Sequence, residues 1–238
     1  MKLEQLYRKA VAAGIANDPR GPEEVRRVLD ERAGEIRKSS KDDERDGWEE
    51  DRLFNPYADT RLLAGDPATE VRKALVGIDM DVAEVLLAHT LNRDRAAGID
   101  LVLAHHPQGV ALAQLSDVMR LQSDMLAAHG VNIAVAEQLL DKRIDEVGRR
   151  VLPGNHNRAV DAARLLGLPM MCVHTPADNC VNTYLAALFE REKPSRLKDL
   201  IALLKTIPEY RAAVRRMAGP RDRQRLRRTA TAAGSPWR

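Results

Sequence analysis

The stretch Gly98-Ile99-Asp100-Leu101-Val102-Leu103-Ala104-His105-His106-Pro107 decides the fold class of this chain. Its first part is a mainly apolar run of strand length, and the two histidines follow that run directly. A shorter apolar run at residues 74–78 precedes it, and Asp79 is placed to cap a helix whose apolar face includes Val82 and Val85. A strand, a helix and a strand in this order predict a parallel pair with a right-handed crossover.

Another apolar run, at residues 168–173, also ends in a histidine, within His174-Thr175-Pro176-Ala177-Asp178. The segment before it predicts a helix that starts at Asn155 or Asn157 and ends at Gly167. Open α/β sheets bind ligands beyond the carboxyl ends of their strands, where both of these histidine-bearing turns are expected. The predicted fold class is therefore α/β, with a mixed or parallel sheet flanked by helices.

The rest of the chain predicts three regions. Helical periodicity in residues 2–40 and a charged stretch at 41–59 indicate a helical N-terminal extension and linker over residues 1–60. Residues 61–220 form the α/β metal-binding module, with further helices at about 113–128 and 135–147. Residues 221–238 carry six arginines and few apolar side chains, so we expect a disordered basic tail.

Composition excludes several classes of protein. No run of about 18 apolar residues or secretory leader is present, which argues against a membrane span or secretion and predicts a cytoplasmic protein. The only cysteines, Cys172 and Cys180, form no disulfide framework, and we expect both to be reduced. The net charge of +3 comes largely from the tail, so a nucleic-acid-binding patch on the folded body is not indicated.

The histidines and Asp178 predict a metal site, with His105, His106 and Asp178 as ligands. Adjacent residues in an extended strand point to opposite sides, so His105 and His106 are expected to serve two metals or two faces of one cluster. Imidazole and carboxylate ligands suit Zn, Mn, Fe, Co or Ni, and the sequence does not choose among these ions. A histidine pair alone is a weak signal, and the second histidine-bearing strand end strengthens it.

The remaining histidines carry weaker signals. His89 and His129 lie in helical patterns and are expected at the surface or in an interface. His156 lies between two asparagines and is expected at the start of a helix.

The segments DLVLAHHPQG (residues 100–109) and VHTPADN (residues 173–179) resemble motifs of the dinuclear-metal GTP cyclohydrolase 1 type 2-like family. This family was first named as an interacting factor of a yeast transcriptional adaptor, and the resemblance covers roughly residues 60–190. It implies that His105, His106 and Asp178 bind a centre of two divalent metal ions, with His174 as a close neighbour. It also implies a ring-shaped homo-hexamer.

The sequence departs from this family near its C-terminus. The family completes its metal centre with a histidine and a glutamate on one helix face, but no histidine follows His174 here. We interpret the tail from about Arg221 as a frameshifted or truncated end, and we expect an incomplete metal site of low occupancy.

Two functions remain open at this point. The first is a metal-dependent hydrolase that acts on a nucleotide or related substrate, in which His174 is the catalytic residue that orients a ligand or relays a proton. The alternative is a non-enzymatic, hexameric metal-binding adaptor or metallochaperone that binds a protein partner.

Overall fold

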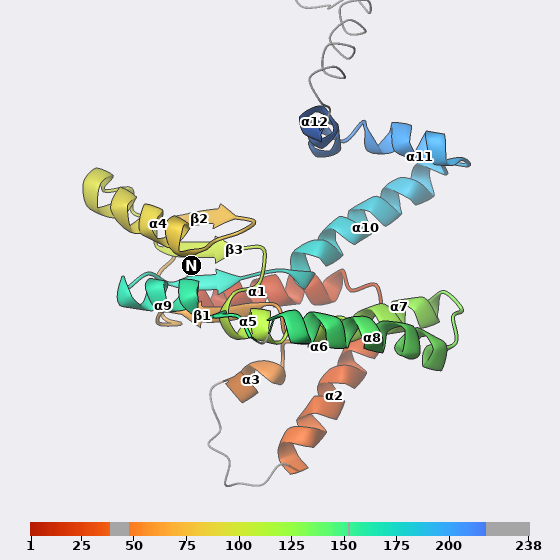
Figure 1. Ribbon diagram of the computed structural model, residues 1–238, viewed down its shortest axis with the longest axis horizontal. Coiled ribbons are helices and arrows are strands. Elements are labelled where there is room, and N and C mark those ends of the chain that lie inside the picture. The colour runs from red at the N-terminus through yellow and green to blue at the C-terminus, as the bar shows by residue number, and fades with distance from the viewer. Residues whose placement is uncertain (39–47, 152, 218–238) are drawn as a thin grey trace, which may run out of the picture. The chain divides into compact units, whose positions relative to one another are not determined.

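A computed structural model describes residues 1–38, 48–151 and 153–217 of the chain (Figure 1). The chain divides into two compact units, Met1–Tyr184 and Leu185–Arg238. The predicted boundary at residue 60 therefore falls inside the first unit. The predicted disordered tail, residues 221–238, lies outside the described residues, as do residues 41–47 of the predicted linker.

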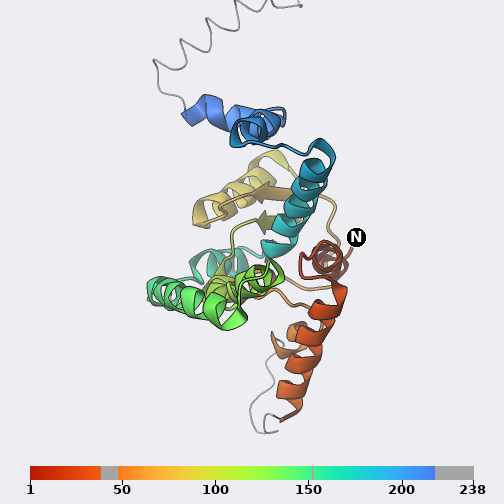
Figure 2. The same cartoon turned by 90° about the vertical axis from the view of Figure 1, so that its right-hand side faces the viewer.

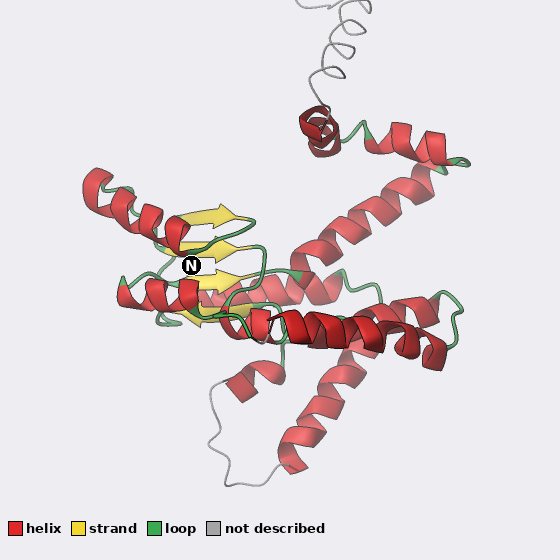
Figure 3. Ribbon diagram, in the orientation of Figure 1, coloured by secondary structure: helices red, strands yellow, loops and turns green. Residues whose placement is uncertain are grey.

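The first unit is built on one four-stranded sheet, in the order β1-β4-β3-β2 (Figure 3). Its strands are β1 (Arg61–Ala64), β2 (Ala74–Gly77), β3 (Leu101–Ala104) and β4 (Met170–Cys172). The pairs β2–β3 and β3–β4 are parallel, whereas β1 pairs with β4 in the antiparallel direction. The prediction of a mixed α/β sheet flanked by helices is thus confirmed.

Helices cover both faces of the sheet. On one face, α4 (Val82–Arg95) and α9 (Arg158–Leu165) bury Val85 and Val160 against Val102 and Met170 of the central strands.

On the other face, α1 (Leu3–Ala16) buries Leu3, Tyr7 and Val11 against Leu101 and Met171. Alternate residues of β3 thus serve opposite cores, as the period-two geometry of a strand requires. Because α1 contributes to a core of the sheet, the N-terminal helix is part of the first unit and not an appendage.

A helical insertion connects β3 to α9. It consists of α5 (Gly109–Ala113), α6 (Leu115–Val118), α7 (Arg120–Ala128) and α8 (Ile133–Val151). The last two pack along one another and lie side by side in both views (Figures 1 and 2). The predicted helix at 113–128 is therefore divided, because α6 and α7 meet at Met119.

The remaining helices complete the two units. Helices α2 (Pro22–Lys38) and α3 (Trp48–Arg52) precede the sheet, and α10 (Thr175–Glu192) leaves β4. The second unit contains α11 (Leu197–Leu204) and α12 (Pro208–Met217). Within the described ranges, no helix is both long and apolar enough to cross a membrane.

The cap of α4 lies two residues later than predicted. The Asp81 side chain accepts a hydrogen bond from the backbone N–H of Val82, and Glu84 completes a capping box. Asp79 was the predicted cap, but the turn after β2 continues for two more residues before the helix begins. Its carboxylate instead contacts His106, so Asp79 belongs to the candidate site and not to the cap of the helix.

Candidate metal centre

His105 stands directly beyond β3, and its backbone still follows the sheet. The N–H groups of His105 and His106 donate to the carbonyls of Gly77 and Ile78, each at 2.9 Å, which extends the pairing with β2. The His105 ring is half-buried, and its Nδ1 lies 3.2 Å from the carbonyl oxygen of Val173. Since a carbonyl only accepts hydrogen bonds, Nδ1 is the donor of this contact, and Nε2 is left to face Asp178.

His174 stands in the equivalent place beyond β4. Its backbone N–H donates to Oγ1 of Thr60 at 3.1 Å, and its ring centroid lies 4.5 Å from that of His105. Asp178 was expected in a turn, but α10 already begins at Thr175, so Asp178 is in the first helical turn. This places Asp178 one turn above His174 on the same helix face.

Three side chains converge at this point: His105, His174 and Asp178, whose donor atoms all lie within 4.8 Å of one another. One carboxylate oxygen of Asp178 lies 3.6 Å from Nε2 of His105, and the other lies 3.6 Å from Nε2 of His174. Ligands at about 2.0–2.1 Å from a tetrahedral ion are separated by about 3.3–3.5 Å. The two separations between Asp178 and the imidazoles are close to this range, so the group could hold a metal ion.

The donor set also fits the chemistry of a catalytic metal. Two imidazoles and one carboxylate leave one coordination position open on a tetrahedral ion, as in catalytic zinc sites. The Nδ1 atom of His174 is buried without a hydrogen-bond partner in the described part of the chain, so its tautomer is not fixed by a neighbour. His174 can therefore present Nε2 to an ion without losing a hydrogen bond at Nδ1.

His106 lies beside this group but outside it. Its Nδ1 lies 2.7 Å from a carboxylate oxygen of Asp79, and its ring centroid is 5.3 Å from that of His105. A carboxylate on the far nitrogen is the usual support for a metal-binding or proton-accepting histidine. The structure thus brings His105, His174 and Asp178 together, while the predicted ligand roles of His105, His106 and Asp178 stay predictions.

Asp59 supports the site and was not identified from the sequence. This fully buried carboxylate accepts hydrogen bonds from the Thr175 hydroxyl, at 2.5 Å, and from the hydroxyl of Thr60. Burial raises the pKa of Asp59, and its hydrogen bonds with the two threonines act against that shift. Asp59 ties β1 to the start of α10, the turn that holds Asp178.

Other candidate residues lie elsewhere. Burial raises the pKa of the Cys172 thiol to about 12, so this cysteine acts as an apolar side chain and not as a ligand. Both cysteines are free, and Cys180 is exposed. His89, His129 and His156 contribute to no metal-ligand group among the described residues.

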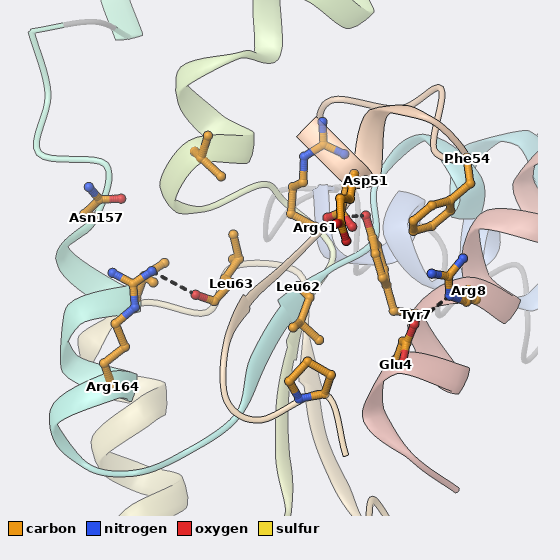
Figure 4. A pocket seen from close by; sticks show the side chains of 14 residues that line it. Glu4, Tyr7, Arg8, Asp51, Phe54, Arg61, Leu62, Leu63, Asn157 and Arg164 are labelled. Carbon is orange, nitrogen blue, oxygen red and sulfur yellow. Dashed lines mark hydrogen bonds and ion pairs between the residues drawn. The ribbon is translucent and has the colours of Figure 1, made fainter. Parts of the chain in front are cut away.

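Two cavities of the first unit are relevant to function. A recess of about 290 Å³ adjoins the candidate centre and is lined by His174, Asp178 and side chains of α6 and α7. A larger cavity of about 690 Å³ lies over β1, where Arg164 donates to the Leu63 carbonyl (Figure 4). Of these two cavities, the recess is the one lined by members of the donor group, His174 and Asp178.

Comparison with known proteins found similarity to a solved structure. No family model and no curated protein matches this chain. The crystal structure of a NIF3 superfamily protein from Sphaerobacter thermophilus is similar, with 27% sequence identity and a TM-score of 0.53. The match covers 64% of this chain and 55% of the other, so this chain spans little more than half of that protein. This likeness agrees with the resemblance seen in the sequence motifs.

Proposed function

We propose that this chain is a NIF3-like metalloprotein that holds a divalent transition-metal ion through His105, His174 and Asp178 and acts as a hydrolase. The observation that carries the proposal is the convergence of these three donors within 4.8 Å at the carboxyl end of two parallel strands. The similarity to a NIF3 superfamily protein supports it. When bound, such an ion supplies Lewis acidity and acidifies water, the chemistry on which metal-dependent hydrolases rely.

The chain's own residues divide the remaining tasks. The Val173 carbonyl fixes the tautomer of His105, and Asp59 holds the first turn of α10 that carries Asp178. His106, oriented by Asp79, is the nearest imidazole outside the three donors, and we assign it the transfer of a proton. His174, predicted from the sequence as the catalytic histidine, is here assigned as a ligand.

A metal titration tests the proposal. Purified protein, stripped with a chelator, is titrated with Zn²⁺ by calorimetry, and bound metal is counted by elemental analysis. We expect one equivalent to bind, and His105→Ala and Asp178→Asn to weaken it by about tenfold or more. His89→Ala removes a half-buried histidine of α4 that lies outside the three donors, and serves as the matched control. Equal affinity in all four proteins would exclude this site.

Hydrolysis is tested separately. Metal-loaded protein is incubated with nucleotides, the substrate class implied by the sequence resemblance, and with simple esters and amides. Turnover that disappears with chelator and in Asp178→Asn supports the enzyme, whereas metal binding without turnover favours the non-enzymatic alternative. The two-metal centre and cytoplasmic location remain predictions.

An adaptor or metallochaperone is the second candidate, and the outer edge of the sheet favours it. Val76 and Ile78 on and just beyond edge strand β2 are 64% and 61% exposed, which is unusual for large apolar side chains on a strand. Such an edge suits association with a protein partner or with further copies in the predicted hexamer. Light scattering of wild-type protein and of Val76→Lys tests this role, because a charged edge should lower the measured mass of an assembly formed there.

A further inference from the structure

The recess beside the candidate metal centre has two contrasting walls. His174 and Asp178 form one wall, and Leu115, Val118 and Met125 belong to the other, which α6 and α7 supply. Its volume of about 290 Å³ is at the lower end of the range for small-molecule pockets, roughly 300–1,000 Å³. A group seated there would lie next to the three metal-binding donors.

Among the residues that the structure describes, no lysine or arginine lines this recess. Its charged lining residues are Asp59 and Asp178, and the polar remainder includes Gln122, Asn179 and Asn182. The Asn179 amide is already engaged, because it donates to the Gly14 carbonyl and to the Tyr57 hydroxyl. Away from the metal ion, the recess therefore offers a phosphate chain no lysine or arginine, and its other wall is apolar, which is unfavourable for a charged group.

The apolar wall of the recess is only partly covered by the protein. Leu115 and Val118 of α6, and Leu121 and Met125 of α7, are all half-buried and face the same recess. The spacings of three and four residues place each pair on one helix face. Removing this apolar surface from water is favourable, and a ligand with an apolar group can do so.

We propose that the substrate of the metal centre carries an uncharged alkyl or aryl group next to the bond that reacts, and that this group enters the recess between α7 and the start of α10. This inference rests on the proposed function, since it places the reacting bond at His105, His174 and Asp178. A nucleotide could satisfy it only by inserting an uncharged part, because the recess disfavours a phosphate chain.

A series of hydroxamic acids tests the inference without measuring activity. The hydroxamate group binds the metal, while the attached chain is lengthened from acetohydroxamate to hexanohydroxamate. Kd values are measured on Zn²⁺-loaded full-length protein by calorimetry. Each methylene that enters the recess should tighten binding about three- to fourfold. We expect hexanohydroxamate to bind at least about tenfold tighter than acetohydroxamate, which allows for incomplete burial of its four extra methylenes.

Two matched variants locate the chain of the ligand. Met125→Gln puts an amide of similar length into the recess, whereas Leu126→Gln makes a comparable change on the adjacent residue, which does not line it. The tenfold gain should fall to about threefold or less in Met125→Gln and persist in Leu126→Gln. The affinity of acetohydroxamate should stay the same in both.

The outcomes separate the two proposals. If no hydroxamate of the series binds to Zn²⁺-loaded protein, the ion has no coordination position open toward the recess and the subsite is refuted, whereas the Zn²⁺ titration described above decides separately whether the metal centre exists. If all hydroxamates bind with equal affinity, the metal centre stands and the apolar subsite is refuted. A gain that survives in Met125→Gln would place the alkyl chain elsewhere and also refute the subsite. The wild-type ligand series decides the question even if the Met125 variant fails to fold.

Discussion

The contact between α1 and α10 allows a demanding test of how the fold positions the candidate site. Gly14 of α1 is buried, and a Cβ built on it would lie 2.7 Å from Cβ of Pro176. Pro176 stands between His174 and Asp178, so this contact determines where the first turn of α10 lies. The Gly14 carbonyl also accepts a hydrogen bond from Asn179 at 3.1 Å. Replacing Gly14 by Ala should therefore disturb both stability and the metal site.

The magnitude follows from the geometry. Carbon atoms pack at about 3.5–4.0 Å, so the new methyl group requires a displacement of about 1 Å. Overpacking of this kind costs about 1–3 kcal/mol, partly offset by a gain of about 1 kcal/mol from Ala over Gly in a helix. Gly34 of α2 has no atoms within 4 Å of its virtual Cβ and supplies the matched control. Gly34→Ala should gain helix stability without strain.

Urea unfolding and Zn²⁺ calorimetry measure the two effects. We expect Gly14→Ala to be less stable than Gly34→Ala by about 1–3 kcal/mol. A 1 Å shift of Asp178 relative to His105 should also weaken Zn²⁺ binding by about tenfold or more, as changes in the support of metal ligands do. If Gly14→Ala unfolds at the same urea concentration as Gly34→Ala and binds Zn²⁺ equally well, the close packing of α1 on α10 is not a determinant of the site.

Three further predictions concern the fold. Burial acts to raise the pKa of Asp18, but the hydrogen bonds and ion pair with Arg20 outweigh burial and lower that pKa. The pair therefore stabilises the fold above about pH 4, and this stabilisation is lost as the pH falls through the lowered pKa. Acid titration of unfolding should show this loss in wild-type protein but not in Asp18→Asn, which should be about 3–5 kcal/mol less stable at pH 7. Leu101→Ala should cost about 2–5 kcal/mol in urea unfolding because Leu101 is fully buried, whereas Leu165→Ala at an 88% exposed position should change stability by less than about 0.5 kcal/mol. Asp81→Ala removes the cap of α4 and should lower stability by about 1 kcal/mol. Unchanged stability would show that the contacts of Asp81 with the start of α4 and with Arg158 do not stabilise the fold.

The sheet centre was predictable because its signals are local. The apolar runs before His105 and His174 are buried between two helical layers, and such strands are continuously hydrophobic. Asp178 was placed in the turn that follows the strand, in a segment that contains Pro176. Proline is, however, well tolerated in the first turn of a helix, where its missing N–H has no partner to lose. The same residue therefore permits the helix that brings Asp178 back over His174.

Strand β1 and its polar surroundings were missed for a different reason. β1 begins with Arg61 and follows a charged stretch, so no apolar run or alternation indicates a strand. Its position depends on partners distant in sequence: Asn55 donates to the Thr60 carbonyl at 2.7 Å and to the Tyr7 hydroxyl at 2.8 Å. Buried polar groups must find such partners, but a local pattern cannot identify them. The support that Asp59 gives to α10 was missed for the same reason.

The adjacent histidines lead to a last prediction about the ligand set. Neighbouring residues at a strand end face opposite sides, and here His105 turns to Asp178 while His106 turns to Asp79. One ion held by Asp178 therefore takes His174 from the next strand in preference to His106. The affinity for the first equivalent of Zn²⁺ should fall by about tenfold or more in His174→Ala and by less than about threefold in His106→Ala. If the two variants lost Zn²⁺ affinity equally, His106 would be a direct ligand of the same centre, as predicted from the sequence, because only a direct ligand should reduce the affinity as much as His174 does.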